Sequence, residues 1–253
     1  MNALTSVEKA VDVLFHLHAA PLPLGVTQLG RDLGLPKSSA HRLLASLVRR
    51  GLVQRDDRGR YAPGLGLVAL GLGALDREPL VAAARGVLAS EAAALGETFF
   101  LVAARAGQLV VLDKAEGTGF LRASPQVGAT VPVHATATGK LFLAFDPGAV
   151  EPDARPERFT ARTPADAAAL EKQVERARRS GLARSREEWI AGLSVVAAPI
   201  LVRGRMLGAL ALGAPTPRLA SFSDHAIDAR VRRAADEIAA RLSGEMRSET
   251  DDV

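Results

Sequence analysis

The chain of 253 residues contains no cysteine, and aromatic residues make up only 4% of it. The absence of cysteine excludes disulfides, thiolate metal sites and a thiol nucleophile. Because 48% of the residues are nevertheless apolar, a core is expected, and it must be built on leucine, valine and alanine. A cysteine-free chain of this kind fits a reducing cytoplasm.

Long hydrophobic runs are also missing. The longest nearly apolar stretch, residues 62–75, is rich in glycine and too short to span a hydrocarbon layer of about 30 Å. No basic segment followed by an apolar one opens the chain at residues 1–6, so we expect no signal peptide. These absences predict a soluble, cytoplasmic protein without a membrane partner.

Positive charge is unevenly distributed. Residues 1–65 contain nine lysines and arginines against five acids, whereas the rest of the chain has 23 of each sign. The whole net charge of +4 therefore lies in the first quarter of the chain. Such asymmetry is typical of a module that binds a polyanion, attached to an electrically neutral partner domain.

Residues 27–60 read as two short helices and a hairpin. Thr27 can cap the first helix, Gly34 suits the left-handed residue that ends it, and Pro36 suits the first position of the second helix. Gly30 inside the first helix should weaken it. Two helices joined by a tight glycine-containing turn indicate a helix-turn-helix.

The second of these helices has one apolar and one basic face. Its apolar residues follow the i, i+3, i+4 spacing of a buried stripe; they are Ala40, Leu43, Leu44, Leu47 and Val48. The opposite face suits a recognition helix in the major groove of DNA, although a solvated basic face of a helical bundle would show the same charges. The candidate DNA-binding residues are Thr27, Gln28, Lys37, Ser38, Ser39, His41, Arg42, Ser46 and Arg58.

Arg58 belongs to the hairpin that follows. Residues 52–55 read as a strand, 56–59 as a turn and 60–62 as the return strand. The turn would place Arg58 at the tip of a wing, where it could touch the DNA backbone or minor groove.

The flanking segments predict the domain limits. Ser6 can cap a first helix whose buried face comprises Val7, Ala10, Val11, Leu14 and Leu17. Residues 65–75 are apolar around the whole helix axis, so that helix must be buried, and we expect it to pack against its copy in a second subunit; a loop closing the first core is the alternative. The predicted divisions are a DNA-binding domain at 1–63, a connecting helix at 64–78, a second domain at 79–246 and a disordered tail at 247–253.

The second domain alternates helices and hairpins, which predicts an α+β fold with helices against an antiparallel sheet. We expect a helix over residues 80–95, a hairpin around Ala106–Gly107, and a helix near Gly139. A further helix should start with Thr163 as its cap and end at Gly181. Two strands should meet near Gly204, and a last helix capped by Ser223 or Asp224 should run through Leu242.

No catalytic constellation is evident. Residues 134–140 resemble a phosphate loop but lack its first glycine and the serine or threonine after Lys140. Glu187 and Glu188, as strand neighbours, would face opposite ways, and His134 has no nucleophile or metal cluster to serve. We therefore expect no catalytic residue, metal or cofactor. Small residues at strand and turn positions can leave a cavity for a small molecule, although close packing is the commoner reason for them.

Several segments together resemble the IclR family of bacterial transcriptional regulators. They are TQLGRDLGLPKSSAHRLLASLVRRGLV with RYAPG, then VPVHATATGK, and finally SREEWIAGLSVVAAPILVRGRMLGALALGAP. They follow the family's order and span nearly the whole chain. The resemblance implies a winged helix-turn-helix, a connecting helix and a GAF-like effector-binding domain. It also implies homodimers, or pairs of dimers, that bind double-stranded operator DNA and respond to a small-molecule effector.

The resemblance also implies the effector-binding residues, which fall here on Ala137, Thr138, Ser185, Leu193, Val195, Ala211 and Gly213. Some members that bind small organic acids present an acid where Ser185 stands. Cysteine is common at the position of Val195, and serine at those of Ala211 and Gly213. This pocket should therefore be less polar and should suit a larger or more apolar acid, or an aromatic metabolite.

The sequence as a whole predicts an effector-responsive DNA-binding regulator, a repressor rather than an activator, of a metabolic operon. Two alternatives remain: a ligand-independent architectural DNA-binding protein, and an enzyme with an appended DNA-binding domain.

Overall fold

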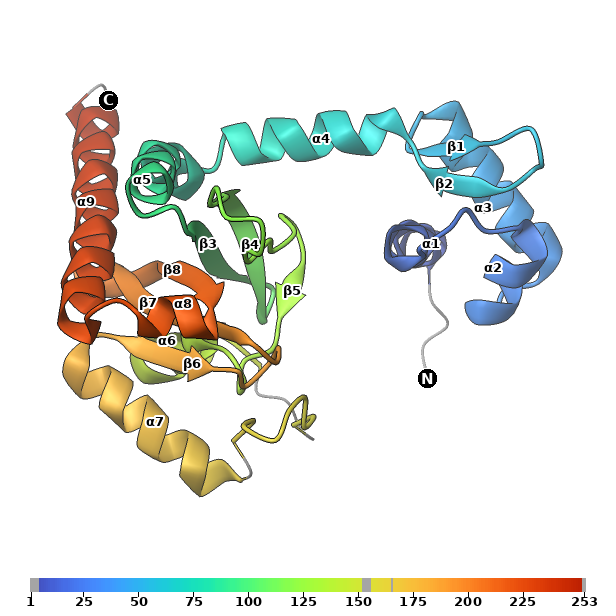
Figure 1. Ribbon diagram of the computed structural model, residues 1–253. Helices are drawn as coiled ribbons and strands as arrows, with labels where there is room; N and C mark the ends of the chain where they lie inside the picture. The colour runs from blue at the N-terminus through green and yellow to red at the C-terminus, as the bar shows by residue number, and fades with distance from the viewer. Residues whose placement is uncertain (1–4, 152–155, 165, 252–253) are drawn as a thin grey trace. The chain divides into compact units, whose positions relative to one another are not determined.

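The computed structural model describes residues 5–151, 156–164 and 166–251, which divide into two compact units at Arg77 and Glu78 (Figure 1). The boundary lies at the C-terminal end of the expected connecting helix. No helix within the described ranges combines the length and the apolar character that crossing a membrane requires.

The first unit is a three-helix core with a two-stranded wing. Its elements are α1 (Ser6–Ala19), α2 (Val26–Asp32), α3 (Lys37–Arg49), β1 (Val53–Arg55), β2 (Tyr61–Pro63) and α4 (Leu65–Asp76). β1 and β2 pair antiparallel, with Arg55 opposite Tyr61. The predicted apolar face of α3 is confirmed: Ala40, Leu44 and Leu47 are buried in the core of this unit, and Leu43 and Val48 pack against it.

The helix starts differ from the predicted ones. Thr5, not Ser6, caps α1, because its hydroxyl accepts from the backbone N–H of Glu8 while the Glu8 carboxylate accepts from that of Thr5. Gly25, not Thr27, precedes α2, and Pro36 is the cap rather than the first residue of α3.

The predicted buried face of α1 is also partly wrong. Val13 and Leu17 are buried, whereas Val7 and Phe15 are 72% and 69% exposed and Val11 is exposed as well. Val7, Val11 and Phe15 are spaced four residues apart, so they form a separate apolar stripe on the opposite side of the helix. The sequence contains both stripes, and only the tertiary contacts of α1 show which one faces the core.

The connecting helix α4 starts where the sequence predicts and is attached to the wing. Gly64 donates its N–H to the carbonyl of Leu52, and Gly66 donates to that of Gly51. A Cβ atom on Gly64 would lie 2.4 Å from the Gly51 oxygen, so this approach requires glycine. None of the residues of α4 is buried within the chain.

The second unit is an antiparallel six-stranded sheet covered by helices on both faces, which confirms the predicted α+β class. Its strand order is β5-β4-β3-β8-β7-β6. The strands are β3 (Thr98–Arg105), β4 (Gln108–Ala115), β5 (Thr130–Val131), β6 (Ala183–Arg186), β7 (Leu193–Val202) and β8 (Arg205–Pro215). The helices are α5 (Pro79–Leu95), α6 (Ala137–Phe145), η1 (Pro147–Ala149), α7 (Ala167–Ser180), α8 (Thr216–Ala220) and α9 (Asp224–Asp251).

α5 and α9 pack together on one face of the sheet, and α6, backed by α7, covers the other (Figure 1). Successive side chains of a strand point to opposite faces. Phe100 and Val102 of β3 therefore join Leu141 of α6 in one apolar core, while the intervening Leu101 is buried on the other face.

The hairpin at Ala106–Gly107, the helix end at Gly181 and the strand connection at Gly204 are confirmed. Asp166 rather than Thr163 caps α7, since its side chain accepts from the N–H of Ala169. α9 does not end at Leu242 but continues to Asp251. Residues 247–251 of the predicted disordered tail are thus helical; no proline interrupts them, and residues 252–253 lie outside the described ranges.

Candidate functional sites: a basic helix face and an apolar cavity

The exposed face of α3 carries five of the nine predicted DNA-binding residues. Lys37, Ser38, His41 and Arg42 surround a shallow open hollow on the first two turns of the helix. Ser46 is exposed one turn further on, where it accepts a hydrogen bond from Arg49 at 3.2 Å. Ser39 alone is half-buried, and Thr27 and Gln28 are exposed in the first turn of α2.

Gly30 holds the two helices of this motif close together. It accepts the N–H of Leu35 at 2.7 Å, and a Cβ atom at its position would lie 2.9 Å from the Leu35 carbonyl oxygen. Glycine at position 30 is unfavourable for the helix itself, but it allows the tight turn between α2 and α3. An alanine at this position would force the two helices apart.

The wing turn is organised by Asp56. Its carboxylate accepts the backbone N–H groups of Arg58 and Arg60 and the Nε of Arg60 at 3.1 Å. The bonds from Arg60 and Arg58 hold the pKa of Asp56 below its usual range. The Arg58 side chain is left exposed at the tip, the position predicted from the sequence.

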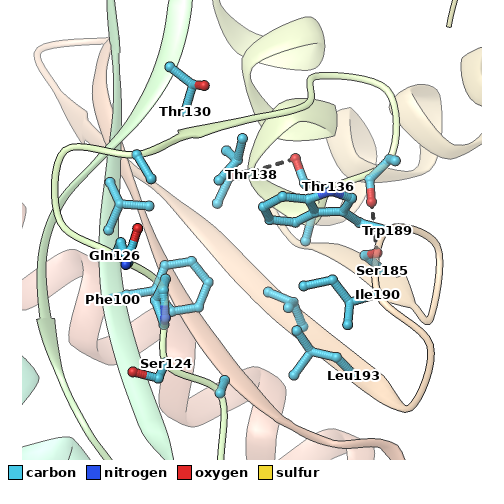
Figure 2. A pocket seen from close by; sticks show the side chains of 18 residues that line it. Phe100, Ser124, Gln126, Thr130, Thr136, Thr138, Ser185, Trp189, Ile190 and Leu193 are labelled. Atoms are coloured by element: carbon cyan, nitrogen blue, oxygen red, sulfur yellow. Dashed lines mark hydrogen bonds between the residues drawn. The ribbon is translucent and has the colours of Figure 1, made fainter. Parts of the chain in front are cut away.

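The second unit contains a cavity of about 330 Å³ between the sheet and α6 (Figure 2). Of the predicted effector-binding residues, five line it: Ala137, Thr138, Ser185, Leu193 and Val195. None of its lining residues carries a charged side chain. The walls are mainly apolar, which is the usual character of a small-molecule site.

Ala211 and Gly213 are not among the lining residues. In β8 they pair with Phe100 of β3 and Val195 of β7 respectively. A Cβ atom on Gly213 would lie 3.2 Å from the Phe100 ring and 3.1 Å from Ala123. The absence of a side chain at Gly213 thus leaves room for Phe100 and Ala123, which line the cavity.

Most of the wall was not predicted. Phe100 and Trp189 supply its aromatic surfaces (Figure 2). The connection between β4 and β5 supplies a second side, which consists of Ala123, Ser124, Pro125, Gln126 and Ala129, and Thr130 of β5 continues it. The remaining lining residues are Val111, Val131, Ala135, Thr136 and Ile190. The β4–β5 connection has no sequence periodicity, so only its position in the fold reveals its role.

A buried ion pair between Lys140 and Glu188 fixes the loop that carries Trp189 and Ile190. Lys140 Nζ lies 2.5 Å from Glu188 Oε2 and 2.9 Å from the Arg184 carbonyl. Burial lowers the pKa of Lys140, and the Glu188 charge opposes that shift. Thr163 fixes the same loop by donating to the Glu188 carbonyl at 2.6 Å.

The structure confirms that Glu187, Glu188 and His134 form no catalytic group and corrects only the expected position of the two glutamates. Glu187 and Glu188 do not lie in a strand but follow β6, and Glu187 has a φ of 57°. They form no carboxylate pair, because Glu188 binds Lys140 while Glu187 faces Arg162. His134 is a buried structural residue whose Nε2 contacts the Glu157 carbonyl and whose ring stacks on Phe159.

A winged helix-turn-helix joined by a helix to an α+β domain with an apolar cavity defines a class of two-domain bacterial transcriptional regulators. The chain belongs to the IclR family. Residues 72–240 match the model of the bacterial transcriptional regulator IclR C-terminal domain, and residues 6–57 match the IclR helix-turn-helix domain. The protein is accordingly a DNA-binding transcriptional regulator and not an enzyme.

Similar proteins agree with this assignment. The chain is 34% identical over 85% of its length to the glycerol operon regulatory protein of Streptomyces griseus, of which it covers 86%. It is 31% identical, over 87% of this chain and 89% of the other, to the transcriptional regulator XynR of Escherichia coli. A crystal structure of a family member from Silicibacter sp. TM1040 has a TM-score of 0.81 and 27% identity, covering 94% of this chain and 96% of the other.

Proposed function

We propose that this regulator is a cytoplasmic repressor whose second unit binds a small organic acid or aromatic metabolite. The cavity is the observation that carries the proposal, because its volume of about 330 Å³ and its mainly apolar lining suit a small molecule. The regulated genes would then serve the metabolism of that molecule, as the name of the glycerol operon relative implies for its own target.

We propose further that the protein acts as a dimer. One recognition helix and one wing offer too small a contact to select a single site in a genome. Leu65, Val68, Leu70 and Leu72 of α4 are all more than half exposed, as are Val7 and Phe15 of α1. A second copy that covers these side chains would hold two recognition helices at a fixed spacing, which suits a palindromic operator. Two such dimers would pair on a longer operator that repeats the site.

A dimer bound to an operator would act as a repressor, because occupancy of a promoter is enough to block transcription. The effector would change this binding by favouring one arrangement of the two recognition helices over the other. A molecule that bound both arrangements equally would shift nothing.

Trp189 permits a direct test of effector binding. It is the only tryptophan in the chain, and it lines the cavity, so its fluorescence reports occupancy without interference. We expect members of a panel of organic acids, phenols and alcohols to change this emission and to alter operator binding at the same concentrations. The panel should include 4-hydroxybenzoate, the compound bound in the structure of a Microbacterium hydrocarbonoxydans homologue with 22% identity, a TM-score of 0.80 and coverage of 95% of this chain and 100% of the other.

Two variants of β7 provide the control. Val195→Phe fills the cavity and should abolish the fluorescence response while operator binding persists. Leu201→Phe alters an exposed residue of the same strand outside the cavity and should change neither. If no compound of the panel raised the melting temperature of the protein, the protein would instead be a ligand-independent architectural DNA-binding protein.

A further inference from the structure

The cavity wall formed by the β4–β5 connection contains neither helix nor strand. Residues 119–125 make no backbone–backbone hydrogen bond within the part of the chain that the structure describes. Ala123, Ser124 and Pro125 nevertheless line the cavity, so their positions must depend on bonds from side chains. A wall that moved freely would have to be ordered each time a ligand bound, at a cost in affinity.

Thr98, the first residue of β3, supplies two buried bonds to this wall. Its hydroxyl donates to the carbonyl of Ala123 at 2.7 Å and accepts the N–H of Gly117 at 3.1 Å. Thr98 is completely buried, and Ala123 and Gly117 are buried as well. One side chain therefore holds both ends of segment 117–123 against the start of β3.

The backbone contact at Gly117 is equally close. A Cβ atom at this position would lie 2.4 Å from the carbonyl oxygen of Gly96, so the approach requires glycine. Thr118 donates its N–H to the same oxygen. The segment thus packs directly on the residues that precede β3, within reach of the Thr98 hydroxyl.

A second set of bonds holds the wall from the surface. Ser124 donates to Glu116 at 2.6 Å and accepts from Lys114 at 3.0 Å. Hydrogen bonds from Lys114, Ser124 and Arg122 lower the pKa of Glu116 to about 2. Water reaches these charged side chains, which reduces what such pairs contribute. The bonds of Thr98 are shielded from water.

Arg218 of α8 holds the tip of the segment. It pairs with the buried Glu97 and donates to the carbonyl of Leu121, and its guanidinium lies against Gly119. Neither Gly119 nor Leu121 lines the cavity. This contact therefore fixes a part of the segment that lies outside the wall.

We propose that Thr98 is a positioning residue for the effector site. Its hydroxyl holds Ala123, and with it the adjoining Ser124 and Pro125, in the place that a ligand requires, although Thr98 itself does not line the cavity. Without the hydroxyl, the Ala123 carbonyl and the Gly117 N–H would be buried without a partner, and the segment would shift to satisfy them. This inference rests on the proposed effector site and names a residue on which its affinity depends.

Thr98→Val tests the inference, because valine has the shape of threonine without the hydroxyl. The full chain is titrated with 4-hydroxybenzoate and with glycerol, and binding is followed by Trp189 fluorescence and calorimetry. The variant should bind whichever probe the parent binds about tenfold more weakly, while operator binding without a probe stays unchanged. Thr98→Ser keeps the hydroxyl and should bind within about twofold of the parent.

Ser194→Ala separates positioning from general stability. Ser194 is a buried serine of β7 whose hydroxyl bonds to Thr216 away from the cavity. Thr98→Val and Ser194→Ala should both lower the melting temperature, but only Thr98→Val should lower the affinity. Thr98→Cys has a weaker donor and acceptor and should lie between the parent and Thr98→Val in affinity. It takes the place of the valine variant if that variant does not fold.

Three outcomes would overturn the inference. If Thr98→Val, or Thr98→Cys in its place, bound a probe as tightly as the parent, Thr98 would stabilise the fold only, and the proposed effector site would stand. Equal losses of affinity in Thr98→Val and Thr98→Ser would contradict the role assigned to the hydroxyl. If neither probe nor any other compound of the panel changed the Trp189 emission of the parent, the proposed effector site itself would fail, and this inference with it.

Discussion

Lys140 on α6 and Glu188 after β6 form an ion pair of 2.5 Å in which both side chains are almost completely buried. The two residues are 48 positions apart, and their pairing connects the helix at one side of the cavity to the loop that carries Trp189. A buried pair of this kind is costly to break from one side, because the remaining charge has no partner.

Lys140→Met should therefore destabilise the second unit by about 3–5 kcal/mol. Replacing both partners, as in Lys140→Met with Glu188→Leu, should recover most of that loss because no charge is left buried. Urea unfolding followed by Trp189 fluorescence reports on this unit. A single variant as stable as the parent would mean that water reaches the pair in solution.

Arg42→Ala tests the recognition helix. An arginine that holds a guanine edge contributes to specificity, so the loss should be about 1–3 kcal/mol on operator DNA and smaller on random DNA. Fluorescence anisotropy with both DNAs measures the difference. Arg205→Ala removes an equal charge from the exposed start of β8 and should affect neither. Equal losses on both DNAs for Arg42→Ala would reduce Arg42 to a phosphate contact.

The exposed apolar face of α4 tests the dimer. Val68→Glu with Leu72→Glu places two charges where we expect a second copy to pack, and should give monomers with at least tenfold weaker operator binding. Light scattering after size-exclusion chromatography measures the mass. Leu201→Glu, at another exposed apolar position, should leave the oligomeric state unchanged. A dimer that survived both changes in α4 would show that the subunits associate elsewhere.

Glu116 tests the electrostatics beside the cavity. Its carboxylate has a pKa of about 2 in the folded chain, against 4.5 for an unperturbed glutamate. Because folding depresses this pKa, the resulting stabilisation is fully present above about pH 4.5 and is lost as the pH falls toward 2. Carbon-detected NMR titration should show the low value, and Lys114→Met should raise it toward 4.5. A Glu116 that titrated normally in the parent would mean that the hydrogen bonds to Lys114 and Ser124 do not persist in solution.

The parts of the fold that local chemistry determines could be predicted from the sequence. The stripe from Ala40 to Val48, the glycine that ends α7 and the hairpin at Ala106–Gly107 each depend on neighbouring residues alone. The start of α7 was misplaced because Thr163 and Asp166 are both good caps, and only the fold shows that the Thr163 hydroxyl instead binds the Glu188 carbonyl.

The cavity was harder to predict because its wall is assembled from distant segments. The family resemblance led to five residues that line it and to two that do not, Ala211 and Gly213, which pair with the lining residues Phe100 and Val195 on neighbouring strands. Neither the β4–β5 connection nor the Lys140–Glu188 pair has a local pattern from which its place could be inferred.

The glycine contact between α4 and the wing has a mechanical consequence. Gly64 and Gly66 bond to the backbone of residues 51 and 52, so the start of α4 is fixed to the wing. A helix of this length spans about 18 Å, so a tilt of α4 by about 10° would carry the wing by about 3 Å, close to one base-pair step. Any tilt of α4 would therefore be passed on to the wing rather than absorbed between the two.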